Sequence, residues 1–396
     1  MEQRMHDDLS TFINDPSTRH TDIDQLVRYL RSRPEAASIQ KTLPVDEMEE
    51  RLEFAKKALD QINVTSSIKS LWQMPMAVIM TLPLDQLRIL SQQHDDRLSN
   101  VGNPLQWSTF HSLSSEAEEL TRIFLIQGNQ PSNKTNSVCR DKMQSELCSE
   151  RDGRRCVLTG TLNPDVCHIF PFSANSSEEK STRLRNISAV FYSIVGERSS
   201  LVLERPSSSD ECWNMICLNK QLHSWWARGH FAFKCLGVLP EAEALTREAG
   251  TGGDVRCIVK LQFHWLPLQP LGKAVEGQWL KPLPNADREA WVRDWEQRSI
   301  DSGPQVKGED SGFVAAIHAA TSRLVQTGHV INIVTASMED GLRMKAMFDI
   351  QWACIRIASM SGAAGDPTFV HNPFDDLDSD SMAEADENID EDDLEG

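Results

Sequence analysis

Arg155-Cys156-Val157-Leu158-Thr159-Gly160 opens the most informative stretch of this chain, which continues through Cys167-His168-Ile169-Phe170-Pro171 and ends with Asn214-Met215-Ile216-Cys217-Leu218-Asn219-Lys220-Gln221-Leu222-His223. The pattern predicts a strand at 155–158, a turn at 159–160 and a second strand at 166–169. An element that begins at Asn214 is expected to become helical by about Leu218 and to end near Gly229. One histidine therefore follows a hairpin and another lies on a helix.

Residues 139–235 resemble the HNH endonuclease family, and in particular fungal HNH nuclease domain-containing proteins that are uncharacterised. The strings that carry the resemblance are RDGRRCVLTG, CHIFPFS and NMICLNKQLHSWW, and weaker similarity continues to about residue 365. The resemblance implies an α+β fold, in which a ββα-metal (His-Me finger) core is embedded in a larger mixed domain. It also implies metal-dependent hydrolysis of phosphodiester bonds in nucleic acid.

The resemblance assigns a role to three polar side chains. His168 matches the general base, Asn214 the residue that orients the base, and His223 a ligand of one divalent metal ion. Such a site needs an ion that polarises the scissile phosphate and a neutral imidazole that deprotonates water. The identity of the ion, Mg²⁺, Mn²⁺ or Zn²⁺, is left open by these residues.

Position 167 departs from the family pattern, because the best-understood members have a carboxylate before the histidine. Cys167 is expected as a metal ligand in its place, and a thiolate suits Zn²⁺ better than Mg²⁺. Two other interpretations stay open: Asp165 replaces the missing carboxylate, or Cys167 is a buried structural residue. The last would make the chain a catalytically weak or inactive HNH-scaffold protein with a binding or regulatory function.

Four basic residues adjoin the predicted site and are candidate contacts to the phosphates of nucleic acid, most simply DNA: Arg154, Arg155, Lys220 and Arg228. A solvated surface is the alternative interpretation of each. Trp225 and Trp226 are expected in the core rather than stacked on bases.

The net charge of −18 is concentrated at the C-terminal end. Residues 372–396 contain twelve Asp or Glu and no Lys or Arg, which leaves −6 for the rest of the chain. This composition predicts a disordered acidic tail, for which a protein partner is one expectation. A mildly acidic remainder does not exclude a local basic surface.

The nine cysteines are expected to be free thiols, because no signal peptide or membrane span is visible and an intracellular location, nucleus or cytoplasm, follows. No CxxC pair occurs, so a zinc ribbon is not predicted. Cys212 and Cys217 are not at metal-pair spacing and receive no ligand role.

Changes in composition and periodicity divide the chain into four parts. A helical N-terminal region is predicted at 1–130, the HNH nuclease-like domain at 139–235, an α+β extension packed on it at 236–371, and the tail at 372–396. Hydrophobic periodicity predicts helices at 21–31, 49–62, 83–94, 114–127, 138–151, 183–195, 287–298 and 342–360, and strands at 230–239, 255–266 and 328–336.

Overall fold

The computed structural model describes most of the chain as a mixture of helices and strands. The described residues are 2–32, 35–37, 42–65, 71–92, 105–125, 141–175, 178–196, 208–241, 255–267, 280–301, 315–364, 366 and 369. The acidic tail predicted from composition lies outside these ranges. Within them, no helix is both long and apolar enough to cross a bilayer.

The largest sheet has three antiparallel strands in the order β4 (Phe231–Pro240), β5 (Cys257–Trp265) and β7 (Val330–Thr335). Its strands are rich in β-branched and aromatic residues, as strands with a buried face usually are. The register of β4 on β5 shifts at Cys235 and Gly237, where the ladder contains a bulge. The structure therefore confirms the three strands predicted at 230–239, 255–266 and 328–336.

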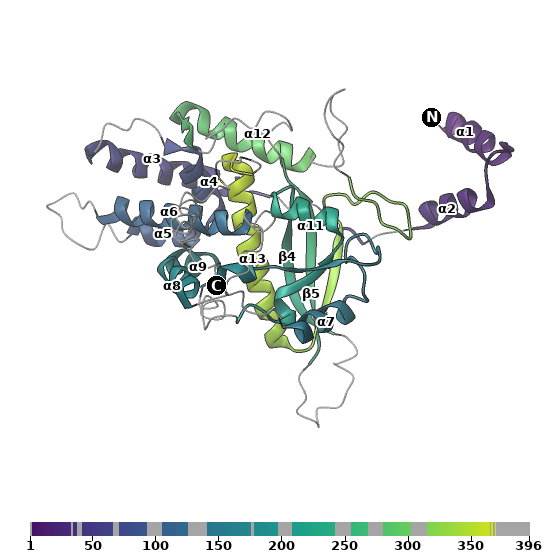
Figure 1. Cartoon of the computed structure of the whole chain (residues 1–396). Helices are drawn as coiled ribbons and strands as arrows, with labels where there is room; N and C mark the ends of the chain where they lie inside the picture. The colour runs from purple at the N-terminus through teal and green to yellow at the C-terminus, as the bar shows by residue number, and fades with distance from the viewer. Residues whose placement is uncertain are drawn as a thin grey trace, which may run out of the picture.

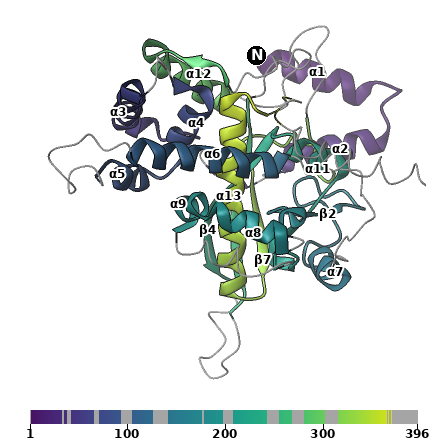
Figure 2. The ribbon, with the colours of Figure 1, turned by 60° about the vertical axis from the view of Figure 1, so that its left-hand side comes forward.

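Helix α13 (Met338–Ser361) runs through the middle of the molecule (Figures 1 and 2). The Ser337 side chain caps its first turn by accepting from the Asp340 N–H, and Gly362 ends it in the left-handed conformation. Every residue from 350 to 361 is buried. One side of the helix packs on β4 and β5, and another contacts helices α4 and α6, so the sheet and the N-terminal helices share one core.

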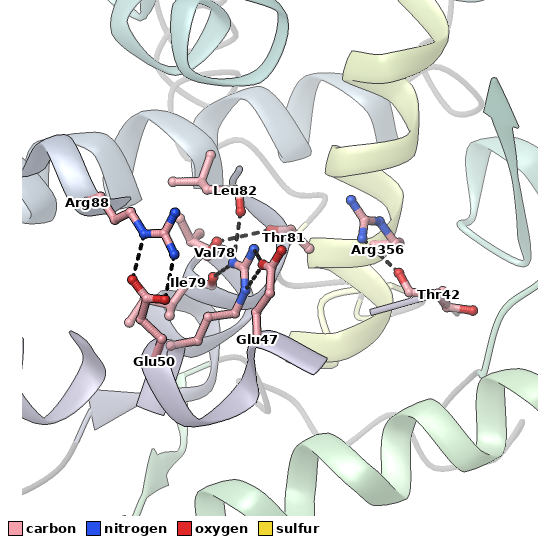
Figure 3. Close-up of polar contacts among 10 residues, drawn as sticks. Thr42, Glu47, Glu50, Val78, Ile79, Thr81, Leu82, Arg88 and Arg356 are labelled. Carbon is pink, nitrogen blue, oxygen red and sulfur yellow. Dashed lines mark hydrogen bonds and ion pairs between the residues drawn. The ribbon is translucent and has the colours of Figure 1, made fainter. Parts of the chain in front are cut away.

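The helices on the far side of α13 are α3 (Met48–Thr65), α4 (Gln73–Thr81), α5 (Leu84–Gln92) and α6 (Leu105–Leu125). Buried Arg51 of α3 donates to the backbone carbonyls of Ile79 and Leu82, which α4 leaves without helical partners at its end (Figure 3). Glu47 pairs with the same guanidinium. In the same region Arg356 of α13 donates to the Thr42 carbonyl at 2.8 Å.

Helices α1 (Glu2–Asn14) and α2 (His20–Arg31) lie apart from α3–α6 (Figure 1). Neither α1 nor α4 was predicted from the sequence; α4 is apolar on all sides and lacks the helical period. Further elements are α7 (Lys142–Arg151), α8 (Glu178–Asn186), α9 (Ser188–Val195), α12 (Arg288–Asp301) and the short pair β1 (Leu71–Trp72) and β6 (Pro282–Leu283).

The strand predicted at 155–158 is wrong. Residue 155 forms an isolated bridge to Leu162, and the segment between them turns on itself, with Gly160 at φ +68° donating to the Cys156 carbonyl. Only the Val157 N–H reaches a neighbouring strand, at the carbonyl of Cys217. The reason is local: the Thr159-Gly160 turn closes over so few residues that no ladder can form.

Candidate active site

A two-stranded sheet and the helix after it carry the candidate active site. Strand β2 (Asp165–His168) pairs antiparallel with β3 (Met215–Leu218), and α11 (Lys220–Ala227) follows β3 after one residue. That residue, Asn219, caps α11 by accepting from the Leu222 N–H. Strand β2 lies between α7 and α11 (Figure 2). The sequence predicted a strand pair before a helix here. The strand that pairs with β2 is 215–218, however, and not the predicted 155–158.

Gly229 ends α11 with φ +74°. A Cβ at this position would come within 3.1 Å of the Ala364 Cβ, so the turn both needs a left-handed residue and passes close to the end of α13. Trp226 of α11 packs on Phe231 and Phe233 of β4. The core position predicted for this tryptophan is confirmed, and the contact fixes α11 against the large sheet.

His168 and Asp210 form a buried pair. The His168 Nε2 lies 2.9 Å from Asp210 Oδ1, and both side chains are only 7% exposed. The second oxygen of Asp210 accepts from the Asp141 N–H at the start of α7, at 2.7 Å. The ring of Phe172 stacks on the imidazole with centroids 5.5 Å apart. These contacts fix the orientation of the His168 ring and favour the tautomer with the proton on Nε2.

Asn214 is completely buried and uses its whole amide to hold the two ends of the intervening loop together. Its Oδ1 accepts from the Phe170 N–H, and its Nδ2 donates to the carbonyls of Phe170 and Ser209. Phe170 follows His168 by two residues, and Ser209 precedes Asp210. The amide therefore holds both members of the buried pair through the backbone.

His223 and Asp165 form a second pair, which solvent can reach. The His223 Nδ1 lies 3.2 Å from Asp165 Oδ2, and each side chain is 36% exposed. Asn219, one turn before His223, donates its side-chain N–H to Thr159 at 3.3 Å, so the local bond expected for it is present. An imidazole and a carboxylate at this distance offer one nitrogen and one oxygen donor to a cation.

Cys167 points away from His168. Side chains alternate along a strand, and in the β2–β3 register Cys167 faces Ile216 whereas His168 faces Met215. The Cys167 thiol is 1% exposed within the main hydrophobic core. Burial, reinforced by the charge of Asp165, raises the pKa of this thiol well above its usual value. Among the described residues, no hydrogen bond or ion pair joins the His168–Asp210 and His223–Asp165 pairs.

The four basic candidates are all exposed. Arg154 is paired with the carboxylates of Glu146 and Glu150 on α7, and Arg155 donates to the Gly160 carbonyl at 3.3 Å. Lys220 begins α11 and Arg228 follows its last residue.

Two important residues were missed at the sequence level. Asp210 received no role from the sequence, and its position four residues before Asn214 was the available signal. Arg151 was seen only as the end of a helix. Its guanidinium is bonded to both oxygens of Asp152 and donates to the carbonyls of Cys212 and Met215, so it fastens α7 to the segment that carries Asn214.

Comparison with known families places this geometry in a class. Residues 156–234 match the family model of the HNH endonuclease domain, and this segment contains β2, β3, α11 and both histidine pairs. The resemblance seen in the sequence is therefore confirmed for this segment. No curated protein and no solved structure matches the chain significantly.

Proposed function

We propose that this chain is a metal-dependent HNH endonuclease that hydrolyses phosphodiester bonds of nucleic acid, with β2, β3 and α11 as its ββα-metal core. One observation carries the proposal. His168 on β2 and its buried partner Asp210 are held in place by Asn214, and all three lie within the segment that matches the HNH endonuclease model.

His168 is the proposed general base. In the neutral tautomer that donates its Nε2–H to Asp210, Nδ1 keeps the lone pair that can take a proton from water. Asp210 then stabilises the imidazolium that proton transfer creates. A group that orients a general base commonly has this role. Asn214 is a positioning residue, because it acts on the ring only through the backbone.

His223 and Asp165 are the proposed holders of the ion. Their donor set, one imidazole nitrogen and one carboxylate oxygen with access to solvent, fits Mn²⁺ or Zn²⁺ and accepts Mg²⁺ less readily. A bound ion would polarise the phosphate and stabilise the leaving oxygen. Cys167 is left out of this ligand set because its thiol faces the core, and Asp165, the alternative weighed from the sequence, takes its place.

The proposed substrate is nucleic acid, most simply DNA. Arg154, Arg155, Lys220 and Arg228 are exposed around the hairpin and helix and are the proposed phosphate contacts. A protein partner for residues 372–396 is a separate proposal that these contacts do not address.

The test is a plasmid-nicking assay with Mg²⁺, Mn²⁺ or Zn²⁺. The His168→Ala variant should lose about 100-fold or more of the nicking rate, as expected when a general base is removed. Asp210→Asn should also slow nicking, because the amide can donate to Nε2 and reverse the tautomer. His223→Ala should raise the ion concentration needed. His6→Ala, on the exposed surface of α1, is the matched control and should nick normally.

Nicking that survives in His168→Ala would contradict the assigned base. If the wild-type chain binds DNA but cleaves it with none of the three ions, the binding or regulatory alternative takes the place of the nuclease.

A further inference from the structure

Three thiols and a carboxylate gather where the end of α7 meets β3. The ligand atoms of Cys148, Asp152 and Cys217 lie within 4.8 Å of one another. The Cys148 Sγ is 3.9 Å from Asp152 Oδ2, and that oxygen accepts from the Cys217 N–H at 2.8 Å. Cys212 provides a third thiol nearby, since the Arg151 guanidinium contacts the sulfurs of both Cys148 and Cys212.

This cluster is shielded from solvent on all but one side. Cys148 and Cys217 are fully buried and the Asp152 side chain is 2% exposed, whereas Cys212 is only partly buried. Cys148 and Asp152 are one helical turn apart at the end of α7. The two other thiols come from the short helix η5 (Cys212–Asn214) and from β3, so three elements converge.

Arg151 gives the cluster an unusual charge balance. Its Nη2 lies 3.4 Å from the Cys148 Sγ and its Nη1 lies 3.6 Å from the Cys212 Sγ, while the guanidinium also pairs with Asp152. Charged N–H donors directed at sulfur stabilise a thiolate more than a thiol. Three thiolates and one carboxylate would carry four negative charges, of which one divalent ion and Arg151 together offset three.

We propose that Cys148, Asp152 and Cys217 bind a structural Zn²⁺ ion, with Cys212 as the fourth ligand. Thiolates with one carboxylate are donors that zinc accepts in tetrahedral sites, and hard ions such as Mg²⁺ do not select them. A tetrahedral zinc with Zn–S bonds of about 2.3 Å separates its sulfurs by about 3.8 Å. The ligand atoms of Cys148, Asp152 and Cys217, which lie within 4.8 Å of one another, would have to close in by about 1 Å at most, and Cys212 would have to move further.

The ion would have a structural consequence for the candidate active site. Cys212 lies two residues after Asp210 and two before Asn214, and Cys217 pairs with Val166 on the strand of His168. Zinc at this place would join α7, η5 and β3. It would thereby position the loop that contains Asp210, the partner of buried His168. The proposal does not depend on the nuclease being active.

The first experiment measures bound metal in the full chain. The wild type, purified without chelator, should contain roughly one zinc ion per chain, as a closed four-ligand site requires. The Cys148→Ser/Cys217→Ser double variant should contain about one zinc ion per chain less than the wild type, whatever the separate His223–Asp165 pair retains. Cys235→Ser, which removes a partly buried thiol from β4, is the matched control and should keep its zinc.

The second experiment does not depend on the variants folding well. Wild-type protein stripped of metal under reducing conditions should show the thiolate-to-metal charge-transfer absorption on addition of Co²⁺, and Zn²⁺ should abolish that absorption. A spectrum of solvated Co²⁺ alone, a wild-type chain purified without zinc, or a double variant that keeps full zinc content would overturn the proposal.

Discussion

Two adjacent residues on β2, Cys167 and His168, have opposite environments although the motif presents them as a unit. Alternation along the strand sends His168 to the face that α7 covers and Cys167 to the face with Ile216 in the core. Adjacent residues therefore have different environments. Polar contacts orient the His168 ring, whereas the core buries the Cys167 thiol. Asp165 lies on the same face as Cys167, but it is at the exposed start of the strand and reaches His223 of α11, whereas Cys167 is enclosed in the core.

A second histidine outside the site gives the chain a pH dependence. His264 in β5 is completely buried, with its Nε2 3.0 Å from the Gln262 side-chain oxygen and its Nδ1 without a partner. Burial, together with the charges of Lys234 and Arg356, lowers its pKa to about 3. The pKa of His264 is therefore lower in the folded chain than in the unfolded chain. At pH values between the two, the unfolded chain binds a proton at this residue and the folded chain does not.

The stability contributed by a neutral His264 is complete above pH 6.5 and is lost as the pH falls towards 3. Between pH 7 and 5 this residue alone should lower the free energy of unfolding by about 2 kcal/mol. Urea denaturation at the two pH values measures the change. His264→Gln should show a smaller loss than the wild type, and exposed His6→Gln an unchanged one. An equal change in the free energy of unfolding between the two pH values for all three proteins would contradict the assignment of this pH dependence to His264.

At the scale of the elements, α7 is attached to the hairpin by Arg151. Its side chain is 11% exposed and its partner carboxylate on Asp152 is 2% exposed. Arg151→Met would leave that carboxylate buried without its counter-charge and would remove the bonds to Cys212 and Met215. We expect the free energy of unfolding to fall by about 3–5 kcal/mol.

Arg154→Met is the matched control for this prediction. Arg154 lies three residues away in the sequence and also forms ion pairs, but its side chain is 63% exposed. Its loss should cost at most about 1 kcal/mol. Chemical denaturation of both variants gives the comparison, and similar values for the two would show that the Arg151 contacts do not stabilise the hairpin.

At the scale of the whole molecule, the N-terminal helices differ in how they join the core. Helix α4 is buried along nearly its whole length against α13, whereas α2 buries no residue and reaches the rest of the chain at contacts such as Gln25 to Ser322. The helical region predicted at 1–130 is thus described as two parts, of which only the second, α3–α6, belongs to the common core.

Shortening the chain should separate these parts. A protein that begins at residue 32 should unfold cooperatively, with stability close to that of the full chain. A protein that begins at residue 131 loses Met76, Ile79 and Met80, and burial of each such side chain is worth about 1.5–3 kcal/mol, against a total stability of about 5–15 kcal/mol. Near-ultraviolet circular dichroism during denaturation measures the difference, and a cooperative transition in the shorter protein would contradict a shared core.

Periodic elements were accessible to prediction because their evidence is local. The helices at 49–62 and 287–298 and the strands at 230–239 and 255–266 have spacings that only one secondary structure satisfies. Helix α4 was missed because it is buried on all sides and shows no period. The strand at 155–158 was predicted wrongly because a β-branched residue beside a turn signal resembles half of a hairpin. The strand that pairs with β2 is β3, which lies beyond the whole 169–214 segment, and such distant pairing is not visible locally.

The sequence by itself determined the HNH resemblance, the three side chains His168, Asn214 and His223, the strand that carries His168 and the helix that carries His223, since these depend on residue type and spacing. Only the tertiary structure decided which groups meet. It brought Asp210 to His168, Asp165 to His223, and Cys148 to Cys217, and it turned Cys167 into the core. The physical reason is that such contacts arise from strand register and helix packing between distant segments, where no local pattern distinguishes a partner from any other polar residue.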